Sequence, residues 1–389
     1  MDAYPTALDL TKKLISLASY VSPGHDETPL TDFLAALLKE AFPEMTVEKQ
    51  YLAQSKRCNL ILKGNGQPKL FVIGHLDTVQ PKAAWSTDPL QPTIIDKKLY
   101  GLGAADMKAS LATFLWALWK EKGTIPLDAV QVLMYVDEEY DFEGVKRYLA
   151  DPISPDFAPK MTLSLDGALG VSTGCRGLIE LNLKIKGVSG HAANPANGVN
   201  AITETVAAFQ SVSEVLKKYH DDALGGTTTN VSYMHGGVLQ KNQDGSEDWL
   251  REGNVIADTA EVIFEVRSSV NDVTATLVLE TIQHFLEKHG LKLSDSNIRH
   301  DIAPWPVVYD PASLAILKES YAAAKVPFAP SSRKLQGYID AQMVVEKIPV
   351  PTFIIGTGGE NKHGANENVP LVNIEQAKDV YTALLHSIL

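Results

Sequence analysis

Several apolar stretches of this sequence end in histidine or carboxylate side chains, which are residue types that bind divalent metal ions. The first is Lys69–Thr78, KLFVIGHLDT, in which an apolar run leads through Gly74 to His75 and Asp77. A short apolar run bounded by glycine predicts a strand that is buried on both faces of a parallel sheet. His75 would then follow the carboxyl end of a strand, where open α/β sheets bind their ligands. Asp77 can accept a hydrogen bond from the second ring nitrogen and fix the tautomer.

The same arrangement recurs later in the chain. Three further apolar runs end in carboxylates or lead to a histidine, and a glycine-containing loop ahead of an apolar helix holds another carboxylate. In chain order these residues are Asp106, Glu138, Glu139, Asp166 and His363. Because open α/β sheets bind ligands at the carboxyl ends of their strands, we expect these side chains to gather at one edge of the sheet. A dry core would not accept that much charge unless it were paired or bound to metal.

The combined set has the size that a two-metal site requires. Two zinc ions about 3.5–4 Å apart need a bridging carboxylate and about two further protein ligands each. The two histidines and three of the carboxylates supply that number, and Glu138 remains to take a proton from the water between the metals. In isolation, the acidic tripeptide at 137–139 would be a solvated turn. Its occurrence together with four other ligand-type residues favours the metal site.

The composition of the whole chain narrows the class of protein. A net charge of −12, with scattered lysine and arginine, argues against nucleic acid or an anionic membrane as the main partner. The apolar segments are too short for a membrane span, and the N-terminal stretch lacks the basic start and apolar region of a signal peptide. Two cysteines, Cys58 and Cys175, are too few for a disulfide framework and indicate a reducing compartment. The sequence therefore predicts a cytoplasmic protein.

The order of the predicted elements indicates two domains, one inserted into the other. Strands and helices alternate up to residue 176, which predicts a mostly parallel sheet in an α/β domain. Residues 177–299 begin with a strand of strictly alternating apolar and polar residues, which has one wet face. They continue as a βαββαβ unit of ferredoxin-like type. The α/β pattern then resumes, with a strand expected at 329–334, so 1–176 and 300–389 are expected to form one metal-binding catalytic domain.

The motifs resemble those of one enzyme family. GHLDTV, LYGLGAADMK, the acidic tripeptide, SLDG, SGHAANPANGVNAI and HGANENV follow the order and approximate spacing of the dinuclear zinc amidohydrolases. That family includes acetylornithine deacetylase, succinyl-diaminopimelate desuccinylase, aminoacylase, carboxypeptidase G and related dipeptidases and tripeptidases. The resemblance covers nearly the whole chain and implies that Asp106 bridges two metal ions. It implies that His75 and Asp166 complete one site, that Glu139 and His363 complete the other, and that the ions are Zn²⁺, for which Co²⁺ can substitute.

The resemblance also implies roles outside the metal ligands. Glu138 is expected to be the general base, and Asp77 the carboxylate behind His75. The inserted domain resembles a lid that also carries a homodimer contact. The lid residues expected to hold the oxyanion or the substrate are His191, Asn254 and Arg267, and Gly337 falls in a substrate-facing turn. The alternatives to these roles are a surface position for Arg267 and a turn ahead of a helix for His191.

Two departures from the family bear on the substrate. Residue 166 is Asp, as in the peptidase branches, where several deacylases carry Glu. The stretch QGYIDAQMV lacks the Ser/Thr-rich, arginine-containing turn of many members. The expected activity is hydrolysis of an amide bond in a small substrate with a free α-carboxylate, either an N-acyl amino acid or a short peptide. The alternatives are an aminopeptidase of the same family and, because no ligand position is lost, less readily a non-catalytic relative acting as a binding protein.

Overall fold

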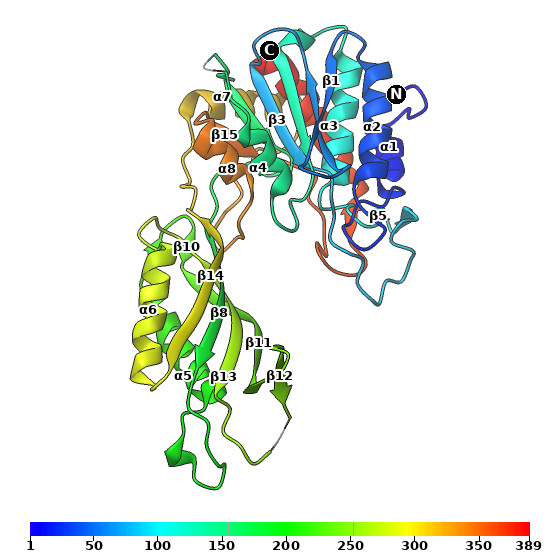
Figure 1. Cartoon of the computed structure of the whole chain (residues 1–389). Helices are drawn as coiled ribbons and strands as arrows, with labels where there is room; N and C mark the ends of the chain where they lie inside the picture. The colour runs from blue at the N-terminus through cyan, green and yellow to red at the C-terminus, as the bar shows by residue number, and fades with distance from the viewer. Residues whose placement is uncertain (155, 252) are drawn as a thin grey trace. The chain divides into compact units, whose positions relative to one another are not determined.

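The structure is a computed structural model that describes residues 1–154, 156–251 and 253–389. The chain forms two compact units (Figure 1). The first unit comprises Met1–Thr173, Val308–Ser332 and Ile339–Leu389, and the second comprises Gly174–Val307 and Arg333–Tyr338. The sequence had assigned the segments 174–176, 300–307 and 333–338 to the catalytic domain, whereas in the structure they belong to the second unit. The Arg176 side chain donates hydrogen bonds to the carbonyls of Leu335 and Gln336, which ties the last of these segments to the second unit.

The first unit is built on a six-stranded sheet in the order β1-β2-β6-β3-β7-β15 (Figure 1). The strands are β1 Thr46–Tyr51, β2 Cys58–Lys63, β3 Leu70–His75, β6 Val130–Tyr135, β7 Met161–Ser164 and β15 Thr352–Ile354. β6, β3, β7 and β15 are parallel neighbours, whereas β1 and β2 are antiparallel at one edge. The predicted mostly parallel α/β sheet is therefore confirmed. Every residue of β3 is buried, as expected of a strand covered on both faces.

Helices cover both faces of this sheet. The buried core on one face includes residues of α1 Ala7–Ile15, α2 Thr28–Ala41, α3 Lys108–Glu121, α7 Pro311–Ala323 and α9 Leu371–Ile388. The other face carries α4 Glu143–Ala150 and α8 Ala341–Lys347. Phe71 of β3 stacks on Tyr148 of α4, with ring centroids 5.9 Å apart. A small antiparallel sheet of β4 Thr93–Ile95, β5 Lys98–Tyr100 and β16 Asn368–Pro370 lies beside this fold, and a short 3-10 turn, Leu127–Ala129, precedes β6.

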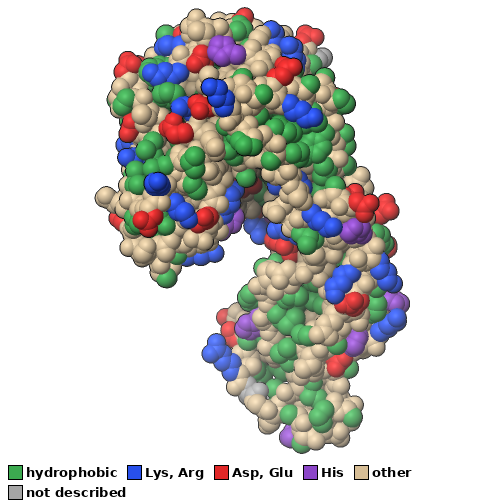
Figure 2. Space-filling model, turned by 180° about the vertical axis from the view of Figure 1, so that it is seen from behind, with side chains coloured by type: hydrophobic (Ala, Val, Ile, Leu, Met, Phe, Trp, Pro, Cys, Tyr) green, Lys and Arg blue, Asp and Glu red, His purple; other side chains and the backbone are tan. Residues whose placement is uncertain are grey.

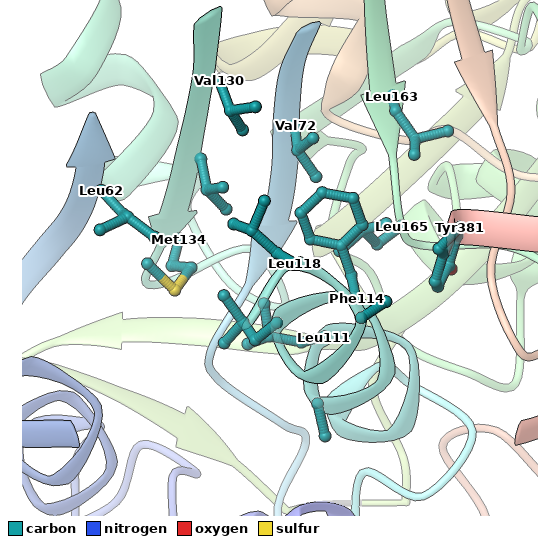
Figure 3. Close-up of a cluster of buried hydrophobic side chains, with 14 of the residues drawn as sticks. Leu62, Val72, Leu111, Phe114, Leu118, Val130, Met134, Leu163, Leu165 and Tyr381 are labelled. Carbon is teal, nitrogen blue, oxygen red and sulfur yellow. The ribbon is translucent and has the colours of Figure 1, made fainter. Parts of the chain in front are cut away.

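The α3 helix is the centre of the core (Figure 3). Leu111, Phe114 and Leu118 recur at helical spacing and pack toward side chains of the sheet, while Tyr381 of α9 meets the edge of the Phe114 ring at 5.5 Å between centroids. Ten of the fourteen residues of α3 are buried, which fixes the helix on several sides. Because α3 begins two residues after Asp106, this packing also fixes the loop that carries Asp106.

The second unit has its own core and its own five-stranded antiparallel sheet, in the order β12-β11-β13-β8-β14. Its elements are β8 Leu178–Lys186, α5 Ala201–Leu216, β11 Thr228–Lys241, β12 Glu247–Leu250, β13 Thr259–Arg267, α6 Ala275–Lys288 and β14 Lys292–Ile302, with a 3-10 turn at Pro195–Asn197 and a two-residue ladder of β9 His220–Asp221 and β10 Gly225–Gly226. Burial alternates along β8 and β13, and their buried side chains pack on α5 and α6. This is the order of elements that the sequence predicted for the inserted unit, with the β11–β12 hairpin added.

Two local expectations differ from the structure. The strand predicted at 329–334 is wrong, since only an isolated bridge between Val171 and Pro330 forms there. Proline has no N–H to give to a strand ladder, and Pro327 and Pro330 both fall in or beside this stretch. The short helix α8 was not predicted, because its seven residues are too few to show a clear apolar period.

The surface contains both signs of charge. On the face shown in Figure 2, lysine and arginine side chains are intermingled with aspartate and glutamate. Among the described helices, none has both the length and the apolar character that crossing a membrane requires.

Candidate metal centre

The carboxyl ends of neighbouring parallel strands bring four of the predicted ligands together, and the loop ahead of α3 adds Asp106. β3 ends at His75, while β6 leads to Glu139, β7 leads to Asp166, and β15 leads to the loop that contains His363. Ligand atoms of His75, Asp106 and Asp166 all lie within 4.8 Å of one another, and so do those of Asp106, Glu139 and His363. The two groups share Asp106. One carboxylate between two sets of ligands is the arrangement that a pair of metal ions needs.

Asp106 faces both histidines. Its Oδ1 lies 3.2 Å from Nε2 of His75, and its Oδ2 lies 3.4 Å from Nε2 of His363. His363 Nε2 also lies 3.0 Å from Oε2 of Glu139. The other oxygen of Glu139, Oε1, is buried and has no hydrogen-bond partner among the described residues.

These observations show that the residues fit divalent metal ions. A buried carboxylate oxygen without a partner costs free energy, and a bound cation would satisfy it. Imidazole nitrogens and carboxylate oxygens are also the ligands that a catalytic zinc site uses. The electrostatics agree: Asp106 and Glu139 raise the pKa of His363 to about 10. Burial lowers the pKa of His75, but the carboxylates of Asp106 and Asp77 outweigh burial and raise it well above its usual value.

Lys362 is a further cationic group at this centre that the sequence did not single out. Its Nζ lies 3.0 Å from Oδ1 of Asp166 and 3.3 Å from Oδ2 of Asp106. Although burial favours the neutral acid, Lys362 and the two histidines lower the pKa of Asp106 well below its usual value. Several positive groups thus already compensate this carboxylate.

Glu138 lies beside the predicted ligands, and its nearest charged neighbours differ from those of Asp106. Its ligand atom is within 4.8 Å of those of His75 and Glu139. Burial, and next the negative charge of Asp340, raise the pKa of Glu138 well above its usual value. Asp340 is itself fully buried, and its Oδ1 accepts a 2.8 Å hydrogen bond from the Tyr135 hydroxyl. Burial raises the pKa of Asp340 to about 7.

Asp77 contacts the acidic pair rather than the imidazole with its carboxylate. Oδ1 and Oδ2 accept the backbone N–H groups of Glu138 and Glu139 at 3.1 and 2.9 Å. The ring nitrogen Nδ1 of His75 lies 3.1 Å from the carbonyl oxygen of Asp77 and 3.6 Å from its carboxylate. The ring nitrogen is thus nearer to the carbonyl oxygen of Asp77 than to its carboxylate, which accepts the two backbone N–H groups. Asp77 positions the backbone of the two glutamates.

Glu367 is a functional residue that sequence reasoning missed. Its buried carboxylate accepts the N–H groups of Gly103, Ala105 and Asp106 at 2.8, 2.8 and 2.9 Å. Burial raises its pKa to about 7, although these backbone donors favour the ionised form. The residue therefore shapes the loop that presents Asp106. The only sequence feature that points to it is its place four residues after His363, in HGANENV.

Two of the predicted substrate residues are neighbours within the second unit. Nδ1 of His191 accepts the N–H of Ala193 at 3.1 Å, so the ring proton is left on Nε2 of the neutral ring. The carbonyl of Asn254 accepts the N–H of Ala192 at 2.8 Å, and His191 forms a bridge with Val255. The structure thus holds the His191 and Asn254 backbones side by side.

The other two lie at a different part of the same unit. Arg267 ends β13 and directs Nε and Nη2 at the two carboxylate oxygens of Glu265, at 3.0 and 3.1 Å. Gly337 lies in the 333–338 segment, and its carbonyl accepts a 3.2 Å hydrogen bond from Arg333. A Cβ at Gly337 would meet nothing within 4 Å, so this position borders open space.

Comparison with known proteins shows which family the chain belongs to. The model of peptidase family M20/M25/M40 matches residues 71–387. The chain is 29% identical to the succinyl-diaminopimelate desuccinylase of Stenotrophomonas maltophilia, over 98% of this chain and 99% of that protein. Its fold is similar to an M20 family metallo-carboxypeptidase from Sulfolobus solfataricus (TM-score 0.75, 16% identity) and a tripeptidase from Staphylococcus aureus (TM-score 0.73, 21% identity), with 98% of each chain covered in both comparisons. Since the family model spans most of the chain, including all five predicted metal ligands, the protein belongs to peptidase family M20/M25/M40.

Proposed function

We propose that the protein hydrolyses an amide bond in a small substrate that carries a free α-carboxylate, either an N-acyl amino acid or a short peptide. The observation that carries this proposal is the pair of ligand groups that share Asp106, with Glu138 beside them. The relatives named above are called a desuccinylase, a carboxypeptidase and a tripeptidase, names that denote removal of a succinyl group or cleavage of peptides.

We assign the metal ligands as two sets that share Asp106. His75 and Asp166 would complete one set, and Glu139 and His363 the other. Zinc is the proposed ion, with cobalt able to replace it, because both accept mixed nitrogen and oxygen ligands. When bound, two such ions would polarise the scissile carbonyl and lower the pKa of the attacking water.

The chain's own residues supply the proton transfers. Glu138 takes the proton of the attacking water and then delivers it to the leaving amine, which is general acid–base catalysis by one carboxylate. Asp77 holds the Glu138 and Glu139 backbones through two hydrogen bonds, so the base and its neighbouring ligand keep fixed positions. Glu367 does the same for the loop of Asp106.

The second unit is proposed to be the lid. His191 would donate from Nε2 to the oxyanion, which its acceptor contact at Nδ1 supports. Arg267 would bind the substrate carboxylate through its guanidinium fork, the geometry that it already uses with Glu265. Asn254 and the turn at Gly337 would border the substrate. Residues 1–176 and 300–389 would then form the catalytic domain, with the boundary details given above.

The second unit is also the proposed site of a homodimer contact. A groove between α5 and β11 includes the exposed side chains of Val206 and Val231, beside the less exposed Phe209 and Met234. Exposed aliphatic side chains around an apolar floor suit contact with a second copy of the chain better than contact with water.

A matched substrate series tests the reaction. N-acetyl amino acids, N-succinyl amino acids and dipeptides are assayed as free acids and as α-carboxamides, with zinc or cobalt supplied. We expect the free acids to show a kcat/KM about 10- to 100-fold higher, because a hydrogen bond to a charged group contributes about 1.5–3 kcal/mol. We also expect two metal equivalents per chain. Faster cleavage of peptides with a free amine and a blocked carboxylate would instead indicate an aminopeptidase, and a metal-loaded protein that cleaves none of them would indicate a non-catalytic relative.

A further inference from the structure

The residue before the general base has a backbone conformation that side chains other than glycine rarely adopt. Asp137 follows the end of β6 and has a φ of +68°. The left-handed region costs a non-glycine residue roughly 1 kcal/mol or more, so surrounding contacts must hold it there. The direction in which Glu138 and Glu139 leave the sheet depends in part on the backbone of this residue, which directly precedes them.

Every polar group of Asp137 has a partner. Its N–H donates to Oε1 of Glu27 at 3.2 Å, and its carbonyl accepts the N–H of Phe142 at 2.8 Å. Its Oδ1 accepts from Nη2 of Arg57 at 2.5 Å, and its Oδ2 accepts the N–H groups of Asp141, ahead of α4, and Glu143, its first residue. Both oxygens of the carboxylate are therefore engaged by groups outside the two ligand sets.

Glu27 and Arg57 form the fixed part of this network. Nε and Nη2 of Arg57 donate to the two oxygens of Glu27 at 2.7 and 2.6 Å, so the pair is a bidentate fork. The Glu27 side chain is fully buried and that of Arg57 is only 18% exposed. Removing one partner of such a pair leaves an uncompensated buried charge, which is costly. Burial lowers the pKa of Arg57, but its two carboxylate partners outweigh burial and raise it.

Arg57 lies in the connection between β1 and β2, and Asn59 of β2 supports the same turn. Asn59 accepts the N–H of Val136 at 3.2 Å and donates to the carbonyl of Gly144 at 2.8 Å. Gly144 must be glycine here, because a Cβ would lie 2.1 Å from the Val136 carbonyl oxygen. The turn from 136 to 144 is thus bound on one side by Arg57 and Asn59, while Asp77 binds the N–H groups of the acidic pair on the other.

We infer that Glu27 and Arg57 are positioning residues for the metal centre: they hold Asp137 in its left-handed conformation and thereby direct Glu138 and Glu139. The inference rests on the proposed function for its catalytic part, and on the geometry alone for its metal-binding part. Neither residue belongs to the ligand groups described above. Arg57 lies 80 positions from Asp137 in sequence, and Glu27 lies 110 positions from it. Lysine cannot replace Arg57, since a single ammonium group cannot make a two-nitrogen fork.

The test uses the full-length protein and three substitutions. Arg57→Lys keeps the charge and removes the fork, while Glu27→Gln keeps the shape and removes the charge. The matched control is Lys49→Met, because Lys49 of β1 pairs with Asp32 of α2 and so joins the same two regions of the chain without contacting Asp137. Each metal-free protein is titrated with zinc by calorimetry, and kcat and KM are then measured on the best substrate of the series above.

We expect the two network variants to bind one of the two zinc equivalents about 10- to 100-fold more weakly, which is the usual cost of losing a residue that orients a ligand. The other equivalent should keep its affinity, and kcat should fall while KM stays within about twofold. Lys49→Met should match the parent in both readouts. Parental zinc affinity in either network variant overturns the inference, and so does an equal loss in all three variants.

The zinc titration separates this inference from the proposed function. If the parent protein hydrolyses no substrate in the series, the proposed function fails, yet a selective loss of one zinc equivalent still supports the positioning role. If Arg57→Lys does not fold, Glu27→Gln provides the same comparison, because it removes a charge without changing the shape of the buried side chain.

Discussion

Glu138, which is partly buried, and Asp340, which is fully buried, are two carboxyl groups that lie near each other and differ in what they contact. Glu138 lies beside His75 and Glu139, with ligand atoms of all three within 4.8 Å of one another. Asp340 is bound by the Tyr135 hydroxyl on one oxygen, and its second oxygen has no hydrogen-bond partner among the described residues. Burial dominates the raised pKa of both groups, and each group's charge acts on its neighbours. Glu138 is thus the one of the two that belongs to a ligand group, whereas Asp340 contacts Tyr135.

Replacing Glu138 with Gln tests its role as the base. Gln keeps the size of the side chain but cannot take a proton, so kcat should fall by at least about 10²-fold while two metal equivalents remain bound. Turnover and metal content are measured on the same preparation. Glu143→Gln, which changes an exposed carboxylate in the same segment, should leave both quantities unchanged. Parental turnover in Glu138→Gln would assign the base to another residue.

Replacing Asp340 with Asn tests the buried carboxyl group through the pH dependence of stability. The folded pKa of about 7 lies above the usual 3.8, so the folded state keeps a proton that the unfolded state releases between these values. The free energy of unfolding of the parent should therefore fall as pH rises through this window. From pH 5 to 8, Asp340→Asn should gain about 2–3 kcal/mol relative to the parent, at about 1.36 kcal/mol per pH unit up to pH 7. Urea unfolding at four pH values measures this difference, and a constant difference would show that Asp340 is ionised in the folded protein at all of them.

At the scale of elements, the candidate metal centre depends on loops that are anchored by the sheet and by α3. The strand ends place the ligands, but the loop at 101–106 reaches them from outside the sheet. This loop packs closely on β3, because a Cβ on Gly74 would lie 2.5 Å from the side chain of Met107, the residue after Asp106. Glu367, just ahead of β16, holds the same loop by three hydrogen bonds. The small β4–β5–β16 sheet therefore joins the Asp106 loop to the segment that follows His363.

Glu367→Gln is expected to weaken metal binding without removing any ligand. An amide has one acceptor oxygen in place of two, so it cannot accept all three backbone N–H groups, and the Asp106 loop should loosen. Zinc affinity, measured by competition with a chromophoric chelator, should fall about 10- to 100-fold. Glu360→Gln is the matched control, because Glu360 lies in the same connection, is exposed and pairs with Lys98. Equal affinities in the two variants would remove Glu367 from the description of the centre.

At the scale of the whole molecule, the two units have separate hydrophobic cores. The core of the first unit combines helices from both ends of the chain, whereas the core of the second comes entirely from the inserted segment. Each unit therefore has the apolar packing that an independent domain needs. The second unit presents the α5–β11 groove, and we predict that two copies of the chain associate through it.

The predicted dimer can be tested by placing charge in the groove. Val206→Asp together with Val231→Asp should convert a dimer into a monomer in sedimentation velocity, since a buried unpaired carboxylate opposes association. Metal content should stay the same, because both residues belong to the second unit. Val372→Asp, which changes an exposed valine of the first unit, should leave the dimer intact. A parent protein that is monomeric at micromolar concentration would end this proposal.

The sequence by itself determined the class of the fold and the set of ligand-type residues. Both depend on local patterns: an apolar run such as 70–73 predicts a buried strand, and the residue after it, His75, must lie at the strand's carboxyl end. The alternating pattern of β8 likewise predicted a sheet with one exposed face. Where proline broke such a pattern, at 329–334, the local prediction was wrong.

Only the tertiary structure decided which side chains orient those ligands. Tyr135 and Asp340 are 205 residues apart, Ala105 and Glu367 are 262 apart, and Arg57 and Asp137 are 80 apart. A local pattern cannot encode such pairs, because they meet only after the sheet and its helices have packed. The same reason explains Asp77, whose carboxylate contacts the N–H groups of the neighbouring strand's turn in preference to the adjacent histidine. Residue types specify a metal centre, and the packed fold determines how each ligand is held.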